Sequence, residues 1–82
     1  MTITLNILAR AYRTKSGEEK IEVRSTQCGD SDTLVKELRT IAADYIFNTP
    51  VKSVSFSWDQ VLVTYADGDT IKYWIEQKWI EL

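Results

Sequence analysis

The chain has 82 residues, of which 44% are hydrophobic and 27% are charged, and its formal net charge at pH 7 is −2. A chain of this length and composition folds as one small domain, residues 1–82, and is not intrinsically disordered. The small net charge excludes a strongly basic protein that binds nucleic acid through charge alone. It also excludes a strongly acidic protein that mimics a phosphate backbone.

Cys28 is the single cysteine, so an internal disulfide is excluded and a reducing, cytoplasmic location is favoured. The N-terminal residues do not have the pattern of a signal peptide. No apolar run approaches the roughly 18 residues of a membrane-spanning helix. We therefore expect a cytoplasmic protein that does not bind membranes.

The N-terminal third of the chain predicts a β-hairpin. Residues 3–13 and 19–26 both alternate in polarity, as half-buried strands do, and Gly17 lies in the turn between them. Pairing Ala11 with Ile21 also sets Arg10 opposite Glu22, which is a favourable cross-strand pair. The face assigned to the core carries Ile3, Leu5, Ile7, Ala9, Ala11, Ile21 and Val23.

A helix is predicted over residues 32–47. Gly29 ends the preceding strand, and Asp30 or Ser31 caps the helix. Pro50 prevents its continuation, because the residue before a proline avoids helical geometry. The apolar stripe of this helix comprises Leu34, Leu38, Ile41 and Tyr45, widened by Val35, Ala42 and Ile46.

The rest of the chain predicts an antiparallel meander with strands at 51–57, 61–66 and 70–76. A tight turn near Trp58 joins the first two strands. A three-residue loop, Ala66 to Gly68, joins the second and third, because the resulting register makes one face uniformly apolar. A two-residue Asp67–Gly68 turn would instead mix polar and apolar side chains on both faces.

Together these elements predict an α+β fold in the order β-β-α-β-β-β, with one helix on one face of an antiparallel sheet of about five strands. The spatial order of the strands is left open. In this fold the helical stripe packs on inward-facing strand residues, namely Leu5, Ile7, Val23, Val54, Phe56, Val63, Ile71 and Tyr73.

The C-terminal residues 77–82, QKWIEL, have no strand to pair with in this predicted sheet. A helical alternative for the tail is weaker, because Ile71 and Tyr73 fit the meander. Burying a large apolar side chain contributes about 1.5–3 kcal/mol, so these residues either pack back on the core or meet another chain. We favour homodimerisation or partner docking through Trp74, Trp79 and Leu82.

No catalytic, metal or cofactor site is predicted. The chain has no histidine to activate Cys28. The DSD and DGD stretches at 30–32 and 67–69 do not continue to the glycine and terminal glutamate of a calcium-binding EF-hand loop. We therefore expect a protein that is not an enzyme and needs no cofactor.

The outer face of the sheet is the candidate binding surface, because aromatic side chains stand among basic ones there. The opposing interpretation is a solvated face whose aromatic rings pack over long aliphatic stems. The candidate partner-binding residues on this face and on the tail are Arg10, Tyr12, Lys20, Arg24, Lys72, Trp74, Trp79 and Leu82.

This pattern favours a small non-catalytic protein-binding module, an adaptor or an inhibitor. Its size and build resemble those of phage and mobile-element inhibitors, although no motif carries the resemblance. The alternative is a single-stranded nucleic-acid-binding protein, in which Tyr12 and Trp74 stack on bases and the neighbouring basic residues contact phosphates. A steep salt dependence of binding would indicate nucleic acid.

Overall fold

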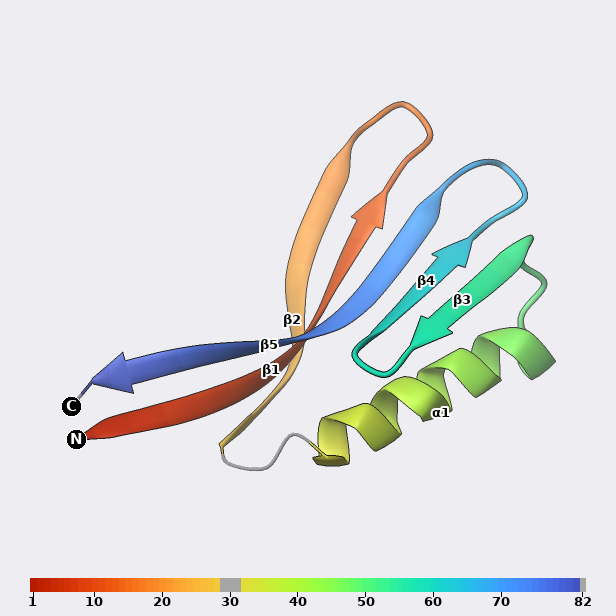
Figure 1. Cartoon of the computed structure of the whole chain (residues 1–82). Helices are drawn as coiled ribbons and strands as arrows, with labels where there is room; N and C mark the ends of the chain where they lie inside the picture. The colour runs from red at the N-terminus through yellow and green to blue at the C-terminus, as the bar shows by residue number, and fades with distance from the viewer. Residues whose placement is uncertain (29–31, 82) are drawn as a thin grey trace.

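The computed structural model describes residues 1–28 and 32–81. These residues form one antiparallel sheet with a helix on one of its faces (Figure 1). The elements in chain order are β1 (Thr2–Arg13), β2 (Glu19–Cys28), α1 (Asp32–Asn48), β3 (Ser53–Ser57), β4 (Gln60–Thr64) and β5 (Thr70–Glu81). The strand order across the sheet is β2-β1-β5-β4-β3. The predicted α+β class and the order β-β-α-β-β-β are confirmed.

Two hairpins in the sheet close with the same kind of three-residue loop. In the β1–β2 loop, Gly17 donates its N–H to the Thr14 carbonyl, and in the β4–β5 loop Gly68 donates to Tyr65, each at 3.0 Å. Both glycines have a φ of +98°, a left-handed conformation that residues with a Cβ rarely adopt. The predicted loop at Ala66 to Gly68 is therefore confirmed.

The register of the meander also follows the prediction. Val63 lies opposite Ile71 and Val61 opposite Tyr73, so the apolar side chains of β4 and β5 share one face. Across the two-residue turn from β3 to β4, Ser57 lies opposite Gln60. A slip by one residue would have turned every one of these side chains to the other face.

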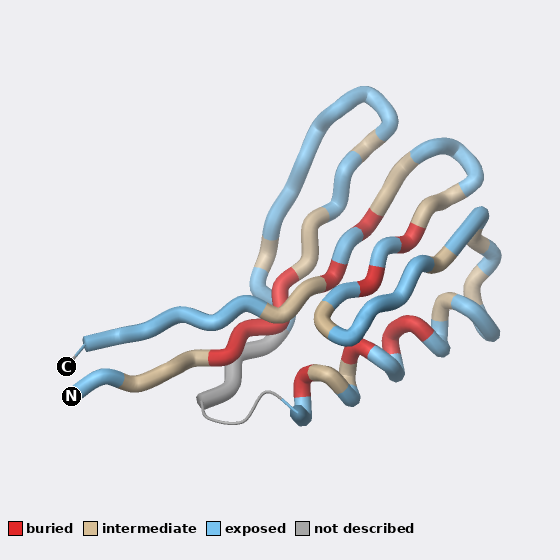
Figure 2. Tube along the Cα trace, in the orientation of Figure 1, coloured by how far each residue is buried: buried red, intermediate tan, exposed pale blue. Residues whose placement is uncertain are grey.

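The core lies between α1 and this apolar face, near the middle of the sheet (Figure 2). The helical stripe is buried at Leu34, Leu38 and Ile41, as predicted, whereas Ile46 is 58% exposed. The buried cluster comprises Leu8, Leu34, Leu38, Ile41, Ala42, Val61, Val63, Ile71 and Tyr73. The predicted helix caps, Asp30 and Ser31, lie outside the described residues. No helix that the structure describes is both long enough and apolar enough to span a membrane.

The predicted inward face of β1 is wrong. β1 pairs with β5 in a register that sets Leu8 opposite Ile75 and Ala9 opposite Trp74. Leu8 therefore joins the core beneath α1, while the odd-numbered residues of β1 face the other side of the sheet. Val23 shares that other side and is 60% exposed, and Phe56, at the sheet edge, is 43% exposed.

The reason for this error is the register between β1 and its neighbour β5. The sequence does not show that β5 is the strand that pairs with β1 on the side away from β2. The residues of β1 and β5 that lie opposite each other could therefore not be predicted. Alternation alone assigns two faces to a strand without saying which one meets the helix. Because β1 is apolar at Ile7 and Ala9 as well as at Leu8, its composition did not decide the question.

The expectation of an unpaired tail is also wrong. β5 continues to Glu81 and pairs with β1 along its whole length, with Trp79 opposite Thr4 and Glu81 opposite Thr2. At this end the two strands extend beyond β2 and β4 and project from the body as a two-stranded arm, residues 2–4 and 79–81 (Figure 1). Leu82 lies outside the described residues.

Candidate protein-binding surface

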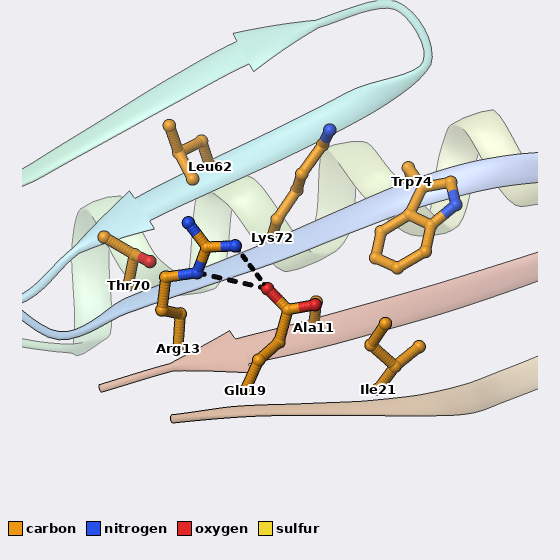
Figure 3. Close-up of a pocket in the computed structure, with 8 residues that line it drawn as sticks. All are labelled: Ala11, Arg13, Glu19, Ile21, Leu62, Thr70, Lys72 and Trp74. Atoms are coloured by element: carbon orange, nitrogen blue, oxygen red, sulfur yellow. Dashed lines mark hydrogen bonds and ion pairs between the residues drawn. The ribbon is translucent and has the colours of Figure 1, made fainter. Parts of the chain in front are cut away.

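The face of the sheet opposite α1, called the open face here, has no helix over it among the described residues. Strand alternation and the observed registers place side chains from four neighbouring strands on it. Those nearest its centre are Ala9, Ala11, Ile21, Val23, Leu62, Lys72 and Trp74. Figure 3 views part of this face from outside, with the helix behind the sheet.

The open face combines a half-buried aromatic ring with exposed aliphatic side chains. Trp74 is half-buried near the centre of the sheet. Ile21 and Val23, on the edge strand β2, are 62% and 60% exposed. Leu62 on β4 is 40% exposed. A sheet normally buries one face and presents polar groups on the other, so adjoining apolar groups on the second face indicate a surface that another molecule covers.

Charged groups lie both at one end of this face and on its central strand β5. Arg13 and Glu19 form an ion pair of 2.6 Å between β1 and β2 (Figure 3). The Lys72 ammonium lies 5.8 Å from the centre of the Trp74 ring, within range of a cation–π contact. A shallow hollow of about 380 Å³ lies between these groups, lined partly by Ala11, Ile21 and Leu62. The open face thus combines apolar side chains with a lysine at its centre and an ion pair at one end, a mixture that protein interfaces commonly show.

The basic and aromatic candidates do not lie together on one face. Arg10, Tyr12 and Lys20 lie on the helix side of the sheet, where β1 and β2 extend beyond the cover of α1, whereas Lys72 and Trp74 lie on the open face. Arg24 also lies on the helix side, with its guanidinium carbon 5.8 Å from the centre of the core ring of Tyr73. The predicted single platform is therefore wrong, because β1 is turned over relative to the expectation.

Several of these helix-side groups already have partners within the chain. Arg10 forms a hydrogen-bonded ion pair with Glu22, which holds the pKa of the guanidinium above its ordinary value. The Tyr12 hydroxyl donates to Asp69, and this bond raises the pKa of Tyr12 to about 12. The same bond lowers the pKa of Asp69. These polar atoms contribute to the fold, which supports the solvated-face interpretation for this region.

Trp79, on the arm, is separate from both groups. Its position opposite Thr4 puts it on the helix side of the ribbon, away from Trp74, and it is 73% exposed. Ile80, on the other side of the arm, is 39% exposed. The arm is thus a second exposed apolar surface. Because the arm projects away from the open face, Trp79 does not form one surface with Trp74.

A group of three tyrosines, which was not predicted as a unit, lies beside the core. The hydroxyls of Tyr45 and Tyr73 lie 3.0 Å apart, and Tyr65 donates to Tyr45 at 3.4 Å. Burial, together with these bonds, raises the pKa of Tyr45 well above its ordinary value. The signal in the sequence was the presence of tyrosine at predicted core positions, since a buried phenol needs a hydrogen-bond partner.

Asn6 is a second residue that the sequence did not reveal. It is fully buried, and its side-chain oxygen accepts a 3.1 Å hydrogen bond from the Gln77 amide where the arm leaves the body. In the described part of the chain, no three side chains of histidine, cysteine, aspartate or glutamate are grouped as metal ligands. The tyrosine group and Asn6 are therefore assigned to the fold.

Comparison with known proteins identifies no relative. No family model matches the chain, and no curated protein or solved structure matches it significantly. The class that the structure itself defines is a small α+β protein with one helix-covered sheet face and one open face.

Proposed function

We propose that this chain is a non-catalytic protein-binding module, an adaptor or inhibitor, that docks a partner protein on its open face. The observation that carries the proposal is the exposure of Ile21, Val23 and Leu62 on the sheet face that also holds Trp74, with Leu62 beyond Lys72 from the other two. Burying such groups against a partner stabilises a complex, and tryptophan is a frequent anchor of interfaces. With a single cysteine, the chain suits the cytoplasm.

A single-stranded nucleic acid is the weaker candidate. Stacking proteins place aromatic rings and basic side chains along one groove. Here Tyr12 and Trp74 lie on opposite faces, and Tyr12 is hydrogen-bonded to Asp69. The apolar side chains of Ile21 and Val23 suit a protein partner better than a phosphate backbone.

The test is affinity capture from a native-cell lysate, followed by titration of the captured protein in purified form. Ile21→Thr combined with Val23→Thr removes apolar surface while keeping β-branched residues suited to a strand. Trp79→Thr, which removes an exposed apolar group on the arm, is the matched control. We expect the double variant to bind the purified partner roughly tenfold or more weakly. The control should bind normally.

Two outcomes would contradict the proposal. Equal binding of the double variant and the wild type would show that the open face is not the site. Capture that disappears after nuclease treatment of the lysate, and that weakens steeply with salt, would identify a nucleic acid as the ligand.

A further inference from the structure

The two edge strands of the sheet differ in chemistry. The edge strand β2 carries the charged residues Lys20, Glu22 and Arg24, and its pairing with β1 shifts register between Leu8 and Ala9. Charges and bulges are the usual devices that keep a sheet edge from pairing with another chain. The other edge strand, β3, reads Ser-Val-Ser-Phe-Ser and has neither a charge, a proline nor a register shift. Its edge is unprotected.

The backbone of β3 is arranged to receive another strand. The Tyr65 N–H donates to the Asp69 carbonyl oxygen. Because every second residue of a strand directs its backbone groups to the same neighbour, Val61 and Val63 also direct theirs to β5. The remaining residues of β4 therefore bond to β3, through the facing pairs Ser53–Thr64, Ser55–Leu62 and Ser57–Gln60. It follows that Val54 and Phe56 direct their N–H and C=O groups outward, away from the sheet.

The side chains beside this edge are apolar. Val54 and Phe56 lie opposite Val63 and Val61, so both project to the helix side of the sheet. Between β3 and α1 lies a groove of about 240 Å³, lined by Arg39, Ala42, Ala43, Ile46, Phe47 and Phe56. Ile46 is 58% exposed and Phe47 is 80% exposed, although both belong to a helix that packs on the sheet.

We propose that β3 is the homodimer interface, at which it pairs antiparallel with β3 of a second copy of this chain. The two-fold axis passes beside Ser55 and is perpendicular to the sheet. Val54 then lies opposite the partner's Phe56, and Ser55 lies opposite the partner's Ser55. The two α1 helices lie on the same face of the continuous sheet, where Ile46 and Phe47 of both copies come together.

The strand is complementary to itself in this register. Pairing about Ser55 matches all five residues of β3 and uses the outward N–H and C=O groups of both Val54 and Phe56. A two-fold axis beside either of those two residues leaves part of the strand unpaired. No like charges face each other within β3, because the strand has no charge.

The free edge is confined to β3 itself. Lys52, which precedes the strand, donates its N–H inward to the Thr64 carbonyl at 2.8 Å, and Trp58 lies in the turn to β4. A five-residue edge that matches itself about one two-fold axis suits a second copy of this chain, since paired copies most often form a symmetric dimer.

This inference goes beyond the proposed function and does not depend on it. Because the axis is perpendicular to the sheet, both open faces of the dimer point the same way. The dimer would then offer a partner two equal surfaces and raise its apparent affinity without any new contact.

The test exploits the self-pairing of Ser55, whose side chain lies on the open face and is exposed. Ser55→Lys and Ser55→Glu each place two like charges opposite each other in the dimer, but leave the charge in solvent in the monomer. We expect the wild type to sediment with twice the mass of one chain. Each variant alone should have a dimer dissociation constant raised roughly tenfold or more. Mixing the two variants should restore the dimer, because lysine then faces glutamate.

Gln60→Lys, an equal change of charge on the interior strand β4, is the control and should remain dimeric. Thermal melting of each variant checks that the fold is retained. A wild type that is monomeric at high concentration would overturn the proposal. A dimer that survives Ser55→Lys in a folded protein, or a mixture of the two variants that stays monomeric, would also overturn it. The open-face variant Ile21→Thr/Val23→Thr should dimerise normally. A wrong dimer proposal would therefore show in the sedimentation of the Ser55 variants, and a wrong proposed function would show in the partner binding of the open-face variant.

Discussion

The Tyr12 hydroxyl donates a hydrogen bond to Asp69, and this bond ties the end of β1 to the loop between β4 and β5. The other carboxylate oxygen of Asp69 accepts the backbone N–H of Lys15 at 2.9 Å. Two loops that lie far apart in the sequence are thereby held side by side. The body of the sheet thus has a polar link at the end opposite the arm.

This link predicts a dependence of stability on acid pH. The pKa of Asp69 is lowered, first by the Tyr12 hydroxyl and then by the Lys15 amide. A lowered pKa contributes stability above the unfolded value of about 3.9, and this contribution is lost as the pH falls through the folded value. In Tyr12→Phe the pKa of Asp69 should rise, and the stability advantage of the wild type should shrink below about pH 4. An NMR titration of the Asp69 carboxyl carbon measures this, and an unchanged pKa would contradict it.

A second prediction concerns alkaline pH. Tyr12 has a pKa raised from 10.0 to about 12, chiefly by Asp69. A raised pKa contributes stability that is fully present below about pH 10 and is lost as the pH rises toward 12. In an ultraviolet titration of tyrosinate, Asp69→Asn should return Tyr12 toward its ordinary pKa. If the titration curves of variant and wild type coincide, the bond is absent in solution.

The core assignment predicts a large effect at Leu38. This side chain is fully buried in the cluster beneath α1, so Leu38→Ala should reduce the free energy of unfolding by about 2–5 kcal/mol. Leu62, on the open face and 40% exposed, is the matched control, and its alanine variant should lose about 1 kcal/mol or less. Urea denaturation compares the two. Equal losses would show that α1 does not cover the face assigned to it.

The two loop glycines predict a matched pair of effects. Gly17→Ala and Gly68→Ala each force a residue with a Cβ into a left-handed conformation, which costs about 1–2 kcal/mol. At Gly68 the new methyl group would also lie 3.4 Å from carbons of the Lys15 side chain, whereas at Gly17 it meets nothing within 4 Å. A distance of 3.4 Å to a flexible side chain is an ordinary van der Waals contact, so thermal unfolding should show losses of similar size at the two sites. A neutral effect at both sites would contradict the loop geometry.

The different exposures of the three tryptophans predict that a quencher in solution reaches their rings to different extents. Trp79 and Trp58 are 73% and 70% exposed, and Trp74 is half-buried. In variants that keep one tryptophan and replace the others with phenylalanine, acrylamide should quench Trp79 strongly and Trp74 weakly. Measurements at low protein concentration keep the chain monomeric. Weak quenching of Trp79 would show that the arm is covered by the chain's own residues.

Local patterns in the sequence were sufficient for the order of the elements, for the loop at Gly68 and for the registers within each hairpin. Gly68 and the apolar alternation of β4 and β5 determined one loop, and Arg10 opposite Glu22 followed from the alternation of the first hairpin. The helical stripe at Leu34, Leu38 and Ile41 was identified for the same reason. Each of these features depends on residues that are close together in the chain, or on a periodicity that one element displays alone.

The tertiary structure alone decided which side of β1 meets α1 and where the tail lies. Both depend on the pairing of β1 with β5, which joins the two ends of the chain with Thr2 opposite Glu81. This register sets Leu8 beneath the helix and turns Ile21 and Val23 to the open face. Alternation by two defines the faces of a strand but not their orientation relative to the rest of the sheet. That orientation comes from a long-range pairing, and a shift of one residue in such a pairing reverses every side chain on the strand.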